Sequence, residues 1–409
     1  ALISGPANDN LGGINLNKVE LAMSTSTNFS NCPGQCAYWT WAGSSWTYGN
    51  EYRKTATKVG ADWSQWKQDA DFPSWSALDG KMVQLQFWAT VEAGNVTSVV
   101  YKTTFTVDTS NAVSTATFPG SLSYFSSLLR ISGTATDSPG SGVDTSKVEA
   151  AIEREDDQKY WNPVTQNFDS GVGAIIWSTA PYYVAGSSWA FTDFNTADAD
   201  FLSDKWYRVK ERVTDLVGNV PVIVHSDIHN NGIRVKIDKN LPVSVTTAPA
   251  LGAGATSYLN YNFSTIAGTA SDGSGSGLRQ VMLRVSRSSA ASQTAQWYNW
   301  ITGFDPGYSG NFDTPADLPL AAWLKMLTGT QISHFGEGYR YEIQAQAADN
   351  AINTAGAYTN YETAYTTAVF VIDFTTPTIE SLTFSTSALN YVYTTAIASG
   401  SFSDPSAAG

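Results

Sequence analysis

Few side chains in this 409-residue sequence are of the types that usually perform catalysis. There are three histidines, and two of them lie close together in His225-Ser-Asp-Ile-His229. The densest group of carboxylates is Glu153-Arg-Glu-Asp-Asp157. Histidines at short spacing can bind zinc, and paired carboxylates can hydrolyse glycosides. No further ligand type clusters beside either segment, so we expect both to be solvated surface.

The sequence also lacks a hydrolase elbow, a P-loop, a dinucleotide fingerprint and a zinc-protease helix. We therefore expect that this chain is not an enzyme. Its formal net charge of −13 disfavours nucleic acid and anionic membranes as partners but is compatible with divalent cations. No apolar run is long enough for a membrane span.

Both cysteines lie in the short segment Asn31-Cys-Pro-Gly-Gln-Cys36. The Pro-Gly pair favours a turn that brings the two thiols together. A zinc site would need further ligands, so we favour a disulfide between Cys32 and Cys36, which implies an oxidising, extracellular compartment. Three sequons permit N-glycosylation in that setting. They are at Asn28, Asn95 and Asn262.

The elements that position these residues are repeated along the chain. The segment Ile131-Ser-Gly-Thr-Ala-Thr-Asp-Ser-Pro-Gly-Ser-Gly-Val143 returns at residues 266–278, with looser copies at residues 3–9 and 399–404. The glycines they share are Gly5, Gly133, Gly268 and Gly400, at spacings of 128 (133 − 5), 135 (268 − 133) and 132 (400 − 268) residues. A repeat of this length is a whole domain rather than a solenoid unit.

Each repeat predicts β-structure. Apolar residues alternate before the Asp-x-x-Gly-Ser-Gly turn, directly after it and again late in the repeat, as in half-buried strands. The last strand ends in an aspartate, and proline or small polar residues follow, which is typical of linkers. The predicted all-β domains are residues 1–108, 109–238 and 239–373, and residues 374–409 are leading strands of a further domain or a donated segment. Residues 316–327 have helical spacing after Pro319, and we interpret them as a decorated loop.

The fourteen tryptophans gather in the middle of the repeats. We expect those that recur, including Trp39 and Trp41, to pack in a core or between domains. Tryptophans without a counterpart, such as Trp63 and Trp66, are expected at an interface. Exposed aromatic side chains can also be platforms for sugars, so glycan binding is the alternative function.

The repeat resembles bacterial immunoglobulin-like (Ig-like) repeats. The resemblance rests on Gly-Thr-Ala-x-Asp followed by Gly-Ser-Gly, the tryptophan cluster, the Asp-x-x-Gly-Asn turn and the closing Val-Asp-x-Thr. Two copies depart from it, because Val91 replaces the aspartate of that turn and Ile352 replaces its glycine. The resemblance implies tandem Ig-like β-sandwiches of a large extracellular or cell-surface protein.

The Ig-like fold would bring several aspartates together. In such a sandwich the turns after the second and sixth strands lie at the end where the linker enters. Six aspartates should therefore meet in two groups: Asp108 with Asp137 and Asp215, and Asp238 with Asp272 and Asp349. Converging carboxylates and carbonyls can bind Ca²⁺. Alternatively, each aspartate only bonds the backbone of its own turn.

These features lead to the hypothesis of a structural array protein, meaning a filament subunit, a stalk or an adhesin shaft. The first domain begins at the strand of Gly5 and lacks the leading strand of the second repeat. Residues 374–396 include apolar Ile379, Leu382 and Phe384 but have no domain of their own. A tail strand donated to the open edge of another copy would give a head-to-tail polymer. The alternative is one continuous covalent array of neighbouring repeats.

Overall fold

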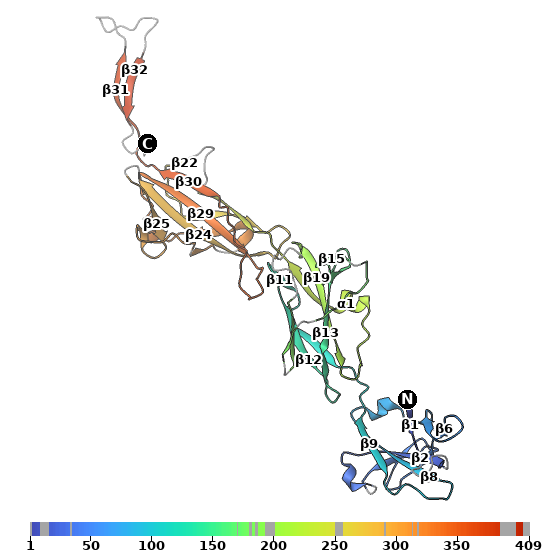
Figure 1. Cartoon of the computed structure of the whole chain (residues 1–409). Helices are drawn as coiled ribbons and strands as arrows, with labels where there is room; N and C mark the ends of the chain where they lie inside the picture. The colour runs from blue at the N-terminus through green and yellow to red at the C-terminus, as the bar shows by residue number, and fades with distance from the viewer. Residues whose placement is uncertain are drawn as a thin grey trace, which may run out of the picture.

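The computed structural model describes residues 2–8, 16–32, 35–169, 171–179, 182–184, 187–192, 201–249, 257–289, 292–312, 314–316, 319–384 and 398–403. These residues form three pairs of β-sheets that follow one another along an extended molecule, with a β-hairpin beyond the third pair (Figure 1). The all-β, tandem Ig-like fold is confirmed. The α-helices described are α1 (His225–Asn231) and α2 (Gly329–Ile332), and neither is long and apolar enough to cross a membrane.

The second domain shows the sandwich most completely. One sheet has the order β10 (Val113–Phe118), β12 (Ile131–Thr136), β18 (Ser188–Phe191), β17 (Tyr182–Val184). The other has the order β11 (Ser123–Phe125), β20 (Ile233–Ile237), β19 (Lys205–Asp215), β13 (Val143–Arg154), β14 (Lys159–Asn162), β15 (Asn167–Phe168), and β16 (Ser178–Thr179) also pairs with β13. Alternate apolar residues of β12, β13 and β19 point between the sheets and form the core.

The third domain repeats this plan. Its first sheet has the order β21 (Val243–Ala248), β23 (Thr265–Ser271), β28 (Leu324–Met326). Its second has the order β22 (Ser257–Leu259), β30 (Thr367–Ile372), β29 (Tyr339–Asp349), β24 (Leu278–Ser289), β25 (Ser292–Asn299), β26 (Gly303–Asp305), and β27 (Thr314–Pro315) pairs with β24. In both domains a short strand runs parallel to the last strand of its domain, β11 beside β20 and β22 beside β30.

The first domain differs from the other two at the edge of β1. One sheet has the order β1 (Ile3–Pro6), β7 (Gln65–Gln68), β6 (Thr57–Lys58). The other has the order β4 (Trp46–Tyr48), β3 (Ala37–Trp39), β2 (Leu16–Thr25), β8 (Met82–Val91), β9 (Tyr101–Thr106), and β5 (Lys54–Thr55) pairs with β2. Within the described residues no strand covers the edge of β1 that β10 covers on β12. A groove of about 580 Å³ lies there, lined by Gly5, Trp66 and Tyr101 among others.

The repeated glycines mark a tryptophan contact in each domain. Gly133 pairs with Trp189 across β12 and β18, and a Cβ atom at Gly133 would lie 2.7 Å from the Trp189 ring and 2.2 Å from the carbonyl oxygen of Thr115. Gly268 has the same relation to Trp323, and Gly5 pairs with Trp66. Gly133 and Gly268 therefore leave room for an indole that a Cβ atom would obstruct, whereas the contact at Gly5 is looser, at 3.1 Å; all three indoles are buried.

This contact corrects two predictions. Trp66 was expected at an interface because it lacked a counterpart, but it is 6% exposed in the core of the first domain and corresponds to Trp189. Residues 316–327 were expected to be a decorated loop. Instead, β28 pairs with β23 and positions Trp323 in the core. The helical spacing after Pro319 corresponds to a short 3-10 helix, η3 (Leu320–Ala322), and β28 follows it.

The second and third domains each have a tyrosine near the start of a long strand, β19 or β29, whose hydroxyl forms a hydrogen bond with the loop before that strand. The hydroxyl of Tyr207 accepts a hydrogen bond from the Leu202 amide at 2.8 Å, and that of Tyr341 accepts one from the Gly336 amide at 2.8 Å. Such a tyrosine corner is a hallmark of Ig-like sandwiches. Burial raises the pKa of each of these two phenols to about 12. The matching position of the first domain is Val83, which cannot form this bond.

The hairpin after the third domain corrects the donated-strand hypothesis. Strand β31 (Thr378–Phe384) pairs antiparallel with β32 (Ala398–Ser403) of its own chain, as β10 pairs with β12. Residues 378–384 are therefore not free to pair with another copy, and they have the pairing of the leading strands of a further domain. Ile379 is 79% exposed, and the side chains of Leu382 and Phe384 lie outside the described part of the structure.

Candidate metal sites

The first candidate site lies between the first two domains. Asp108 is in the linker between β9 and β10, Asp137 follows β12, and Asp215 ends β19. The structure brings them together, since one carboxylate oxygen of each lies within 4.8 Å of the others. Asp215 is 1% exposed, and the other two are half-buried.

Turn geometry explains most of their hydrogen bonds. Asp215 Oδ1 accepts backbone N–H groups from residues 217–219, and the Asn219 amide donates to Asp215 Oδ2 at 2.7 Å and to the Asp108 carbonyl at 3.2 Å. Asp108 Oδ2 accepts from the Ser141 amide at 2.6 Å. Asp108 Oδ1, however, is buried without a hydrogen-bond donor. A buried carboxylate oxygen with no donor is costly, so turn chemistry alone does not account for the cluster.

The second candidate site has the same plan between the second and third domains. Asp238 follows β20, Asp272 follows β23 and Asp349 ends β29, again with an oxygen of each within 4.8 Å of the others. Asn360 takes the part of Asn219, donating to Asp349 Oδ2 at 3.1 Å and to the Asp238 carbonyl at 2.9 Å. The Oδ1 atom of Asp272 is buried and has no hydrogen-bond partner.

Burial and crowding disfavour ionisation at this second site. Burial raises the pKa of Asp349 to about 6; hydrogen bonds from Ala351 and Asn360 oppose the rise, and the charges of Asp238 and Asp272 add to it. Burial also raises the pKa of Asp272. A divalent cation among the three carboxylates would remove this penalty, and oxygen ligands of this kind suit Ca²⁺.

The two junctions differ in how the domains pack. At the second junction Ile352 inserts against the core of the second domain, its carbonyl accepts from the Ser126 amide at 2.8 Å, and its amide donates to Tyr124 at 3.1 Å. The turn pattern has a glycine at this position. The third domain has Ile352 instead, and its side chain packs against the core of the second domain. At the first junction the matching residue is Gly218, and Val217 beside it stays 60% exposed along a shallow cleft.

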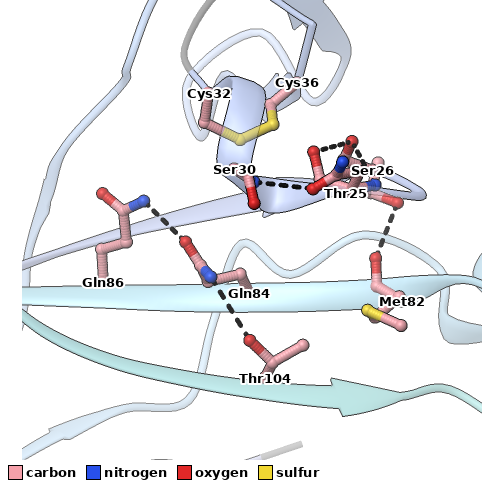
Figure 2. Close-up of a disulfide and its surroundings, with 10 residues drawn as sticks. Thr25, Ser26, Ser30, Cys32, Cys36, Met82, Gln84, Gln86 and Thr104 are labelled. Carbon is pink, nitrogen blue, oxygen red and sulfur yellow. Dashed lines mark hydrogen bonds between the residues drawn. A yellow bond between two sulfur atoms is a disulfide. The ribbon is translucent and has the colours of Figure 1, made fainter.

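Cys32 and Cys36 form a disulfide in the loop before β3, as Figure 2 shows. The side chains that follow this loop, Tyr38, Trp39 and Trp41, are buried, as expected for the recurrent tryptophans. The indole N–H of Trp39 donates to the Asp71 carbonyl at 2.7 Å. The disulfide therefore fixes the chain's entry into β3 rather than an exposed aromatic surface.

All three sequon asparagines are exposed, namely Asn28, Asn95 and Asn262. Their accessibility leaves the glycosylation prediction open to a direct test. Asn28 Oδ1 accepts the Ser30 amide at 2.9 Å.

The tryptophans offer no platform for a sugar. All fourteen lie in the described part of the chain, and each is buried or half-buried. Trp63 is half-buried against the core of the first domain, where Trp39 and Trp41 also lie. Glycan binding through flat, exposed indoles therefore has no support in this structure.

The histidine segment is not a solvated loop, contrary to the prediction. His225 and His229 lie on α1. One ring nitrogen of each histidine and one carboxylate oxygen of Glu153 all lie within 4.8 Å of one another. Glu153 was expected on the surface, yet it is 0% exposed. This cluster is not visible in the sequence because Glu153 lies 72 (225 − 153) residues before His225, and the described residues of the other domains have no helix directly before the last strand.

No family model and no curated protein matches the sequence. Among solved structures, a tetra-tandem repeat from the extending region of a large adhesion protein is 14% identical over 99% of this chain and 84% of that one, with a TM-score of 0.29. A 1.5-MDa bacterial ice-binding adhesin is 12% identical over 91% and 90%, with a TM-score of 0.32. Fibronectin(III)-like modules of Clostridium thermocellum CbhA are 17% identical over 64% and 94%, with a TM-score of 0.27. Superposition this limited carries no argument about function.

Proposed function

We infer that this chain is a structural segment of an extracellular array, in which Ca²⁺ at each domain junction holds consecutive Ig-like sandwiches in line. The observation that carries the proposal is the repeated aspartate cluster. Both clusters combine one linker aspartate with two turn aspartates, and both leave one buried carboxylate oxygen without a donor. Such a cation would suit a stalk or adhesin shaft of the bacterial Ig-like type, because it would hold consecutive domains together.

The cluster couples two domains because its members come from both sides of the linker. Asp108 continues from the last strand of the first domain, whereas Asp137 and Asp215 belong to the second. A cation bound to all three would fix the linker against the following domain. Ligands that include several carboxylates and backbone carbonyls are typical of Ca²⁺, and extracellular modules bind it with dissociation constants of about 10⁻⁴–10⁻³ M.

One further observation supports an extracellular setting. The Cys32–Cys36 disulfide is of the kind that persists in an oxidising compartment.

The direct test is thermal unfolding of the full chain in CaCl₂ and in EDTA. Ca²⁺ at about 100 times its dissociation constant should stabilise a domain that contributes a site by about 2.7 kcal/mol. The variants Asp215→Asn and Asp349→Asn should each lose this effect for their own domain. Glu92→Gln, which removes one charge from an exposed turn outside both clusters, is the matched control. Equal melting with and without Ca²⁺ in the unsubstituted chain would overturn the proposal.

A further inference from the structure

A cluster of another kind lies on the flank of the second domain, where α1 packs beside β13 and β19 (Figure 1). Ile228 of α1 is fully buried and fixes the helix there, in contact with Ala151 and Tyr160. His225 and His229 lie one turn apart on this helix. Their ring centroids are 5.5 Å apart and their planes differ by 30°.

Glu153 is the residue that most needs a partner. It is 0% exposed, and its Oε1 atom lies 2.8 Å from His229 Nδ1. Its Oε2 atom is buried and has no hydrogen-bond partner. Within the described residues, the ion-pair partner of Glu153 is His229, which is charged only when it is protonated; no lysine or arginine pairs with Glu153 there. A carboxylate buried in this way needs a positive charge beside it.

The surroundings of His225 prepare it to bind a metal. Its Nδ1 atom is 2.8 Å from the Tyr160 hydroxyl. When that hydroxyl accepts the Nδ1 proton, Nε2 keeps its lone pair for a ligand, and metal-binding histidines are commonly oriented in this manner. Ile175, Ile176 and Trp177 pack against the apolar group of Ala151, Tyr160 and Ile228 beside the histidines.

We propose that Glu153, His225 and His229 bind one zinc ion. Two imidazoles and a carboxylate are the ligand types that Zn²⁺ and its neighbours in the transition series prefer, whereas Ca²⁺ prefers oxygen alone. The ion supplies the positive charge that the buried Glu153 lacks. Three protein ligands leave a fourth position for water or for a ligand from another molecule.

The third domain is an internal comparison. Glu153 lies opposite Arg208 of β19, and the residue in that register in the third domain is Ser286, opposite Glu342 of β29. The histidine of that domain, His334, is 3.0 Å from the Tyr298 hydroxyl and belongs to no such cluster in the described residues. The described part of the third domain therefore contains no equivalent site, and His334 is a matched control.

The test is titration of the full chain with ZnCl₂ by calorimetry, after removal of metals with EDTA and dialysis into excess CaCl₂ so that the aspartate clusters are occupied. The unsubstituted chain should bind one zinc ion per molecule. Glu153→Gln and His229→Gln should each weaken binding by at least about tenfold, since even residues that only support a metal ligand have effects of this size. His334→Gln should leave the affinity unchanged.

Co²⁺ provides a second readout, because Co²⁺ held by nitrogen and oxygen ligands absorbs visible light. This absorption should be lost in His225→Gln. Circular dichroism checks that His225→Gln is folded, so that the test still stands if Glu153→Gln fails to fold. Absence of zinc binding by the unsubstituted chain would overturn the proposal. Binding that survives His225→Gln and His229→Gln, or that is lost in His334→Gln, would overturn it as well.

Discussion

Substituting Gly133 with alanine should destabilise the second domain far more than the same change at Gly5 destabilises the first. Gly133 does not have a positive φ, so its role is purely steric. The added Cβ would lie 2.2 Å from the Thr115 carbonyl and 2.7 Å from the Trp189 ring, where ordinary contacts are 3.4–4 Å. Backbone atoms of β10 would have to move by more than 1 Å.

Overpacking a core typically costs about 1–3 kcal/mol, and a backbone obstacle places Gly133→Ala at the upper end, about 3 kcal/mol. For a domain of this size that corresponds to a fall in Tm of about 10 °C. At Gly5 the nearest atom is in the Trp66 ring at 3.1 Å, and no described strand lies on the side of β1 that corresponds to β10. Gly5→Ala should therefore cost less than about 1 kcal/mol, because the indole can shift by a few tenths of an ångström.

Differential scanning calorimetry of the full chain would measure both variants, and hydrogen exchange of β12 and β1 would assign each transition to its domain. Gly268→Ala, whose Cβ would lie 2.1 Å from the Val245 carbonyl, should behave like Gly133→Ala in the third domain. If Gly133→Ala melted like the unsubstituted chain, or if Gly5→Ala were equally damaging, the steric explanation of the repeated glycine would be wrong.

Three further predictions concern single groups. Tyr341→Phe should lower the stability of the third domain by about 1–3 kcal/mol in denaturant unfolding, because the Gly336 amide loses its acceptor. An unchanged unfolding midpoint in Tyr341→Phe would refute this. An equal loss of stability in the control Val83→Ala would be no evidence for or against this bond. In EDTA, the raised pKa of Asp349, about 6, contributes stability that is fully present below the ordinary pKa of 3.8 and is lost as the pH rises through 6. The stability of Asp349→Asn should therefore rise by up to about 3 kcal/mol relative to the unsubstituted chain between pH 4 and pH 7. Parallel profiles of stability against pH for the two proteins would contradict this. Freshly isolated protein should contain no free thiol by intact-mass analysis with an alkylating reagent, and modification of both Cys32 and Cys36 without prior reduction would disprove the disulfide.

The sequence was sufficient for the features that recur at constant spacing. Strand alternation and the repeated glycine predicted the all-β domains, and the expected geometry of the sandwich grouped Asp108 with Asp137 and Asp215 as the structure does. These predictions depend on backbone topology, which each repeat encodes locally.

The predictions that were wrong depended on side-chain contacts across the core. Trp66, Trp189 and Trp323 follow their glycines by 61 (66 − 5), 56 (189 − 133) and 55 (323 − 268) residues, so a signal for the shared contact was present but was hidden by the variable middle segments. Ile352 departs from the turn pattern, and only the neighbouring domain explains why. Glu153 is buried beside His229 of α1, and the described residues of the other domains have no helix at this place.

The proposed role of Ca²⁺ is tested most directly by the distribution of bend angles at the two junctions, measured by electron microscopy of single full-length chains in CaCl₂ and in EDTA. At the second junction, where Ile352 packs against the preceding domain, the distribution of bend angles should stay narrow in both conditions. At the first junction, which lacks such an insertion, the distribution of bend angles should be narrow with Ca²⁺ and broad in EDTA. In Asp215→Asn this distribution should be broad in both conditions. Identical distributions in the two conditions at the first junction would contradict the claim that Ca²⁺ stiffens this array.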